Sequence, residues 1–151
     1  MQELLLEAKS RLRQENYRLT TQREVILELL VRHPRRHFTA EEIRESLRRN
    51  HPQLGLSTVY RTLVVLEDLG IVGRIDVGDG KSRYEFYGAG SQPHCHLVCL
   101  ECGRMTEAHY SGARLVEELL WKEKFEVKDH SLVFFGLCRS CRGTGRKPRT
   151  C

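Results

Sequence analysis

Two Cys-x-x-Cys motifs constrain this chain of 151 residues more than any other feature of its sequence. The first motif is Cys99 with Cys102, and the second is Cys138 with Cys141. Four thiolates can close a tetrahedron around Zn²⁺, and zinc bound in this way ties distant parts of a small domain together. We therefore predict a structural zinc site. The alternative, buried or disulfide-bonded cysteines, is disfavoured because nothing in the sequence resembles a secreted protein.

Two histidines, His94 and His96, come just before the first cysteine pair. One residue separates them, so both imidazoles lie on the same face if the segment is a strand. This arrangement suits a second metal, separate from the thiolate site. Cys95 then points to the opposite face, where we predict that it packs or belongs to a neighbouring site.

Four stretches of the first half have apolar residues at helical spacing. They run from residue 3 to 15, from Thr20 or Thr21 to Pro34, from Thr39 to before Asn50, and from Ser57 or Thr58 to Gly70. Thr39 and Glu42 have the spacing of a capping box, and Gly70 is placed to end the fourth helix in the left-handed conformation. In that helix we expect Val59, Leu63, Leu66 and Leu69 to face the core and Thr58, Arg61 and Val65 to face away from it.

Residues 71–77 and 81–87 have the composition of two strands, with a turn at 78–80 between them. Three helices followed by a hairpin form the winged-helix plan, in which the last helix before the hairpin enters the DNA major groove. The sequence thus predicts an α+β chain that begins with a winged helix-turn-helix domain.

The only convincing linker contains small and turn-forming residues at 88–93. We expect a DNA-binding domain at 1–87, a hinge at 88–92, a metal-binding domain at 93–141 and a basic, disordered tail at 142–151. In the third segment we predict strands at 96–100 and 104–110, a helix around 115–120, and a last strand region between 125 and 137.

The net charge is +5, from 25 Lys and Arg against 20 Asp and Glu, which is a weak indication of a polyanionic partner. No stretch is long and apolar enough to cross a bilayer, and the first residues lack the pattern of a signal peptide. We expect a cytoplasmic protein without a membrane partner.

Further residues could ligate a metal together with His94 and His96: His37, Glu85, Glu107, His109 and His130. Two or three imidazoles with one or two carboxylates suit Fe²⁺, Mn²⁺, Co²⁺ or Zn²⁺. Spacing alone does not decide which of these side chains converge.

Six motifs, at residues 17–23, 37–43, 57–63, 82–85, 94–103 and 138–141, together resemble the ferric uptake regulator family of bacterial repressors. The resemblance runs from about residue 10 to residue 141. It implies a homodimer whose second, small α/β domain mediates dimerisation. Carried over position by position, the structural zinc ligands are Cys99, Cys102, Cys138 and Cys141, and the regulatory ligands are His37, Glu85, His94, His96 and Glu107. The DNA-contacting positions are Arg18, Ser57, Thr58, Tyr60 and Arg61.

The resemblance implies a repressor that binds operator DNA when a regulatory metal is present. Peroxide sensors of the family have aspartates at the positions of Glu85 and Glu107, so the two glutamates favour an iron-responsive member that controls iron uptake. We expect Fe²⁺ as the regulatory metal, with Mn²⁺ or Zn²⁺ able to substitute. A peroxide sensor or a zinc sensor of the same family is the alternative, and Cys95 keeps the second of these open.

Two other classes of protein use some of the same residue types. An enzyme could use the same histidines and carboxylates, but the sequence has no phosphate loop and no nucleophile elbow, so we expect neither catalysis nor a small-molecule substrate. A structural zinc module that binds another protein would have no use for Arg18, Tyr60 and Arg61.

Overall fold

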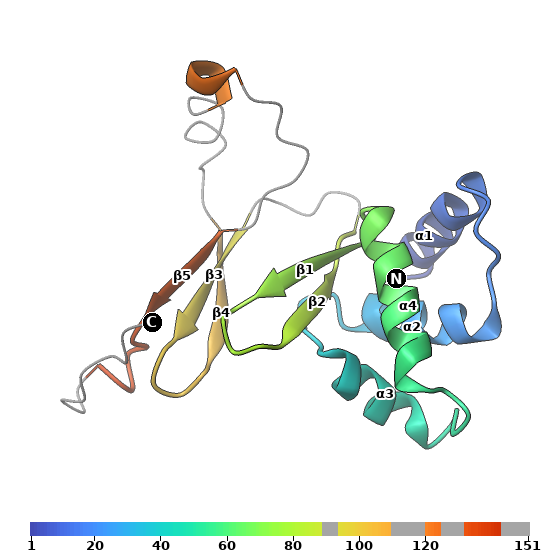
Figure 1. Ribbon diagram of the computed structural model, residues 1–151, viewed down its shortest axis with the longest axis horizontal. Helices are drawn as coiled ribbons and strands as arrows, with labels where there is room; N and C mark the ends of the chain where they lie inside the picture. Colours follow the sequence, from blue (N-terminus) through green and yellow to red (C-terminus); the bar gives the residue numbers. More distant parts are fainter. Residues whose placement is uncertain (89–93, 110–119, 125–131, 143–151) are drawn as a thin grey trace. The chain divides into compact units, whose positions relative to one another are not determined.

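A computed structural model describes residues 1–88, 94–109, 120–124 and 132–142 of the chain (Figure 1). Contacts within the chain divide it into two compact units, residues 1–91 and residues 92–151, which we call unit 1 and unit 2. The bounds that we predicted for the domains and the hinge remain predictions. None of the helices in the described segments is long and apolar enough to cross a membrane.

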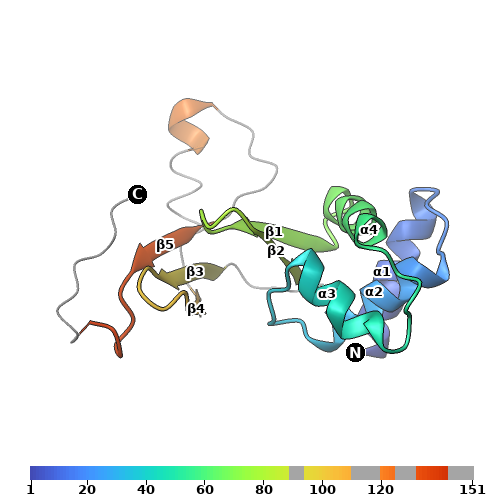
Figure 2. The same cartoon turned by 60° about the horizontal axis from the view of Figure 1, so that its bottom comes forward.

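Unit 1 consists of four helices and a hairpin (Figure 1). The helices are α1 (Gln2–Gln14), α2 (Thr21–Arg32), α3 (Ala40–Arg48) and α4 (Leu56–Asp68), and the antiparallel strands are β1 (Val72–Asp76) and β2 (Ser82–Phe86). The helix α3 packs against α4, and α2 contacts the other three helices (Figure 2). This is the winged-helix order that the sequence predicts.

Side chains at the helix ends explain why the helices begin and end where they do. The Thr20 hydroxyl accepts a hydrogen bond from the Arg23 amide and caps α2. Thr39 and Glu42 form the predicted capping box at the start of α3, with the Thr39 amide donating to the Glu42 carboxylate at 2.9 Å. Gly70 follows α4 with φ +61°, a conformation that glycine adopts without the steric penalty of a side chain.

The prediction for α4 was wrong in two details. The helix begins at Leu56 rather than at Ser57 or Thr58, because the Gly55 carbonyl already accepts bonds from the amides of Thr58 and Val59. In addition, Val65 packs partly buried against the core, whereas its neighbour Val64 is 51% exposed.

The core of unit 1 takes apolar side chains from all four helices and the hairpin. Full burial of one such side chain stabilises the fold by about 1.5–3 kcal/mol. The largest of these side chains, all with an exposed fraction of at most 1%, are Leu12, Ile26, Leu27, Leu30, Phe38, Ile43, Leu63, Leu66, Ile71 and Ile75.

Unit 2 contains a three-stranded sheet in the order β4-β3-β5 (Figure 1). The central strand β3 (His94–Cys99) pairs antiparallel with β4 (Met105–His109) and parallel with β5 (Val133–Gly136). The first two strands match the predicted ones within two residues, and Gly103 makes the tight turn between them with φ +68°. Residues 115–119 of the predicted helix and most of the tail lie outside the described residues, and so does the part of the last strand region between 125 and 131; residues 120–123, at the end of that prediction, are helical.

Candidate metal centres and nucleic-acid face

Four thiol groups converge in unit 2. Cys99 ends β3, Cys102 follows in the turn to β4, and Cys138 and Cys141 come directly after β5. Because β3 and β5 are parallel neighbours, the cysteines that follow them meet at the same edge of the sheet. All four sulfur atoms lie within 4.8 Å of one another, and those of Cys102 and Cys138 are 3.8 Å apart.

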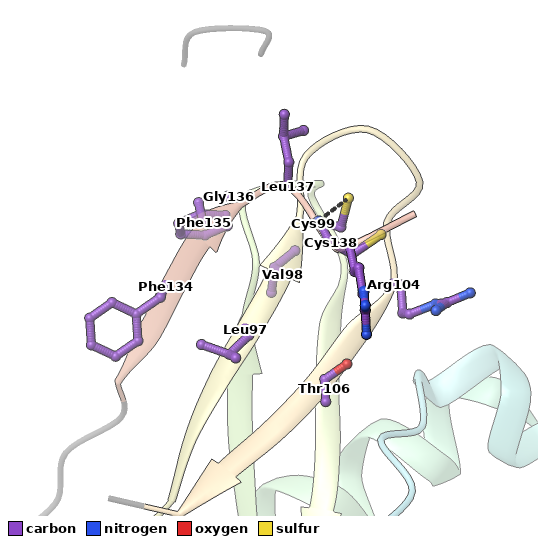
Figure 3. A pocket seen from close by; sticks show the side chains of 11 residues that line it. Leu97, Val98, Cys99, Arg104, Thr106, Phe134, Phe135, Gly136, Leu137 and Cys138 are labelled. Atoms are coloured by element: carbon purple, nitrogen blue, oxygen red, sulfur yellow. Dashed lines mark hydrogen bonds between the residues drawn. The ribbon is translucent and has the colours of Figure 1, made fainter. Parts of the chain in front are cut away.

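This arrangement of sulfur atoms fits Zn²⁺. A tetrahedron with Zn–S bonds of about 2.3 Å places its sulfur atoms roughly 3.8 Å apart, which the separation of Cys102 and Cys138 matches. The backbone also favours a thiolate, since the Cys138 amide donates to the Cys99 sulfur at 3.3 Å (Figure 3).

Backbone amides and neighbouring thiols shift the pKa values of two of these cysteines in opposite directions. The amide of Cys138, followed by that of Cys102, lowers the pKa of Cys99 to about 6. In contrast, hydrogen bonding with Cys138 raises the pKa of Cys141 to about 12. Crowded thiolates repel one another, so all four sulfurs ionise together only around a cation.

In unit 1, the partly exposed His37 pairs with the buried Glu85. The Phe38 amide donates to the Tyr84 carbonyl at 2.9 Å and the Tyr84 amide donates to the Phe38 carbonyl at 2.8 Å, which places the preceding His37 beside the following Glu85. His37 Nε2 lies 3.1 Å from Glu85 Oε2, and the two side chains are 12% and 2% exposed. A buried carboxylate and imidazole with an adjacent nitrogen and oxygen can hold a first-row divalent metal.

In unit 2, the remaining predicted ligands share one face of the sheet. The rings of His94 and His96 are 4.9 Å apart, which confirms that they point to the same side of β3. His96 lies opposite Glu107 in the register of β3 and β4, and His94 lies opposite His109. Two strands therefore bring three imidazoles and a carboxylate to one patch.

Cys95 is buried on the other face of β3, as predicted. Its exposed fraction is 5%, and its sulfur lies 3.4 Å from the Ala108 carbonyl oxygen. This environment is that of a packed core cysteine. Two other cysteine and histidine positions, Cys151 and His130, lie outside the described residues.

The helix α4 presents the residues that we predicted to read DNA. Tyr60 is 41% exposed, and its hydroxyl donates to the Glu41 carboxylate at 2.9 Å. Arg61 Nε donates to the Ser57 carbonyl at 3.2 Å, and Arg61 Nη2 lies 3.4 Å from the Ser57 hydroxyl. The contact between Tyr60 and Glu41 was not foreseen, because no pattern in the sequence shows which residue of α3 faces α4.

Arg18 lies exposed in the connection between α1 and α2. Its carbonyl accepts a hydrogen bond from Arg23 Nη1 at 2.6 Å, and the Arg23 guanidinium lies 5.6 Å from the centre of the Tyr17 ring. These contacts fix the backbone of the connection while the Arg18 side chain remains on the surface. Its predicted role in DNA binding remains a prediction.

A second feature that the sequence did not reveal is an ion pair in the hairpin. Arg83 donates to the two Asp79 carboxylate oxygens from both terminal guanidinium nitrogens, Nη1 at 3.1 Å and Nη2 at 2.6 Å. These hydrogen bonds lower the pKa of Asp79 to about 2. The turn between β1 and β2 is therefore internally braced.

A winged-helix unit with an exposed arginine and tyrosine on its last helix, followed in the same chain by a four-thiol centre, is the architecture of a DNA-binding protein with a structural metal site. The chain belongs to the ferric uptake regulator family, because the sequence profile of that family matches residues 14–135. Members of this family are metal-responsive transcription regulators.

Two relatives come from Bacillus subtilis (strain 168). The ferric uptake regulation protein is 40% identical over 137 residues, which are 89% of this chain and 92% of that protein. The peroxide operon regulator is 36% identical over 138 residues, which are 91% of this chain and 92% of that protein. Both kinds of regulator are thus similar to this chain along almost its whole length.

Two solved structures share the fold. The ferric uptake regulator of Helicobacter pylori, described as having three functional metal binding sites, has a TM-score of 0.75 and 25% identity, and the match covers 96% of this chain and 95% of that one. A zinc uptake regulator complexed with zinc and DNA has a TM-score of 0.66 and 29% identity, covering 93% of this chain and 94% of that one. The family assignment therefore rests on sequence and on fold.

Proposed function

We propose that this protein is an iron-responsive repressor that binds operator DNA as a homodimer and controls iron uptake. In this proposal Fe²⁺ is held by His37 and Glu85 of unit 1 together with His94, His96 and Glu107 of unit 2. The observation that carries it is the buried carboxylate of Glu85 beside His37, because burying a carboxylate is costly and its cost is offset when a cation binds there.

The mechanism follows from ligands that are divided between two units. A ligand shifts a conformational equilibrium only by its differential affinity for the two states. A metal that needs side chains from both units binds tightly only when the units are correctly placed, so it selects that arrangement. Because half-site spacing is set by the geometry of a dimer, the selected arrangement would match α4 of each protomer to successive turns of the major groove.

In the DNA complex, we assign base contacts to Tyr60 and Arg61 on α4. Ser57 and Thr58 near the start of the helix, and Arg18 in the connection between α1 and α2, are further DNA-contacting residues. A guanidinium pairs with guanine in the major groove, and an aromatic ring can touch a thymine methyl group. The exposed positions of Tyr60 and Arg61 support this assignment. The similarity to a regulator solved with zinc and DNA also supports it.

We assign a structural role to zinc at Cys99, Cys102, Cys138 and Cys141. The convergence of the four sulfur atoms within 4.8 Å of one another supports a bound cation at this site. Zinc in such a closed thiolate site contributes folding energy rather than a regulatory response.

The edge strand β5 supports the homodimer. In the described part of unit 2, β5 pairs only with β3, and it exposes Phe134 by 55% and Phe135 by 46%. Leu97 is 42% exposed on the neighbouring strand, and a cavity of about 400 Å³ lies among these side chains (Figure 3). An apolar edge strand left in water invites pairing with another strand, and a second copy of the chain supplies one.

DNA binding measured with separate metals tests this function. Duplexes would be selected by the wild-type protein from a random pool, and affinity titrated anaerobically with Fe²⁺, Mn²⁺ and Zn²⁺. We expect Fe²⁺ to raise the affinity, and His37→Ala or Glu85→Ala to abolish the gain. Retention of the full gain in these variants would exclude the mechanism.

The same titration separates the alternatives. A gain confined to trace free Zn²⁺ would indicate a zinc sensor. Oxidation of His94 or His96 by peroxide with Fe²⁺ bound would indicate a peroxide sensor; the second Bacillus relative is named a peroxide operon regulator.

A further inference from the structure

We propose that Glu41 is a positioning residue that fixes Tyr60 for base recognition and so contributes to operator specificity. This inference rests on the proposed function, because it assumes that α4 reads DNA. It adds a residue of α3 that makes no base contact of its own. The contact that carries it is the hydrogen bond of 2.9 Å from the Tyr60 hydroxyl to Glu41 Oε1.

The geometry makes Glu41 suited to this task. Glu41 lies in the first turn of α3, whose start is fixed by the capping box of Thr39 and Glu42 and whose body packs on α4. The carboxylate therefore stands on a rigid support, and the bond from Tyr60 spans two helices rather than one turn. An exposed tyrosine without such a partner would sample several rotamers, and ordering it on DNA would reduce affinity.

The negative charge of Glu41 is a second reason to expect that this residue contributes to operator specificity. A carboxylate beside a surface that approaches DNA repels phosphate, so it opposes sequence-independent binding. Hydrogen bonds from its own amide, then from Tyr60 and Thr39, lower the pKa of Glu41, and the charge of Lys81 adds to this effect, so the carboxylate stays ionised at neutral pH. A residue that weakens nonspecific binding while holding a base-reading side chain increases the ratio of specific to nonspecific affinity.

Arg61 is held in a parallel way by its own helix. Its guanidinium contacts the carbonyl and hydroxyl of Ser57, one turn earlier on α4. The two side chains assigned to base recognition are thus both held in place in the free protein, one from within α4 and one from α3. Such pre-organisation reduces the entropy lost on binding.

A purely structural role for Glu41 is the alternative, because an acidic residue in a first turn stabilises a helix through its dipole. Three variants separate the two roles. Glu41→Asp keeps the charge at the helix start but shortens the side chain by one methylene, so it loses Tyr60. Glu41→Gln keeps an oxygen acceptor within reach but loses the charge. Glu41→Ala loses both.

Affinity would be measured by fluorescence anisotropy on the duplex selected by the wild-type protein with Mn²⁺, and on a scrambled duplex. We expect Glu41→Asp and Glu41→Ala to weaken binding to the selected duplex about threefold to tenfold, the range of one exposed hydrogen bond. Glu41→Gln should stay within about twofold of the wild type, with tighter binding to the scrambled duplex. In a Tyr60→Phe background, Glu41→Asp should cause no further loss.

The outcomes separate this inference from the proposed function. If the wild-type protein shows no metal-stimulated selection of DNA, the function is wrong. If the wild-type protein selects DNA but Glu41→Asp binds as tightly, or its loss adds fully to that of Tyr60→Phe, the inference is wrong and the function stands. As a readout without DNA, the Tyr60 ¹³Cζ resonance should titrate at lower pH in Glu41→Ala, since Glu41 raises the pKa of Tyr60.

Discussion

Replacing Glu85 with glutamine should separate the stability of the metal-free protein from its response to metal. Glu85 is 2% exposed and 3.1 Å from His37 Nε2. Exchanging a buried carboxylate for a neutral amide removes its desolvation cost and keeps an acceptor for His37. We therefore expect the metal-free free energy of unfolding to stay unchanged or to rise by up to about 1 kcal/mol.

The same substitution should weaken the response to metal. Loss of a ligand should raise the dissociation constant for Mn²⁺ about 100-fold or more, since losing even a supporting residue costs 10–100-fold. At a free Mn²⁺ concentration about 100 times the wild-type constant, the wild type gains about 2.7 kcal/mol, whereas the variant gains only about 0.4 kcal/mol.

Circular dichroism at a helical wavelength would follow urea unfolding of unit 1 with and without Mn²⁺, and a competing fluorescent chelator would give the dissociation constants. Glu24→Gln is the matched control, because Glu24 also pairs with a base, Lys9, but lies outside the site. Equal metal-dependent gains for Glu85→Gln and the wild type would refute the assignment of Glu85 as a ligand.

Three further predictions concern the zinc centre, a helix cap and the hairpin. Cys138→Ser should lose stoichiometric zinc, measured by elemental analysis of protein purified without added metal, while Cys95→Ser keeps it. Thr39→Ala should lower the free energy of unfolding of unit 1 by about 1 kcal/mol in urea denaturation, since it removes the cap of α3. The pKa of Asp79, from carboxyl ¹³C titration, should be about 2 and return toward its ordinary value in Arg83→Gln. Because this pKa is lowered by folding, the ion pair stabilises the protein above the ordinary carboxyl pKa and loses its effect as the pH falls toward 2.

The fold of unit 1 could be predicted because its local patterns agree with one another. Helical spacing, the Thr20 cap and the Thr39 capping box all indicate the elements that the structure contains. The errors lie where no side chain marks the boundary. The helix α4 begins after Gly55, which offers no capping side chain, and the rotation of the helix decides whether Val64 or Val65 faces the core.

Some features of the candidate sites could likewise be predicted from local spacing, and others could not. Spacing alone predicted that the four thiols form one site and that His94 and His96 share a face. The two Cys-x-x-Cys motifs and the alternation of side chains along a strand are both short-range patterns. The pairing of His37 with Glu85 depends on a bridge between Phe38 and Tyr84, 46 positions apart by their numbers, and only the resemblance to a family suggested it. The contact between Glu41 and Tyr60 depends on how two helices cross, which no local pattern encodes.

The parallel pairing of β3 with β5 makes the folding of unit 2 depend on zinc, because the thiols that follow the two strands are far apart in the sequence. Joining Cys102 to Cys138 closes a loop of 36 positions, and a cross-link of that length restricts the unfolded chain by roughly 4 kcal/mol. A newly made chain without zinc lacks this restriction, so pairing of β5 with β3 is less favourable. Under the proposed function, a cell short of zinc would therefore also lose its response to iron, because the regulator folds less readily without zinc.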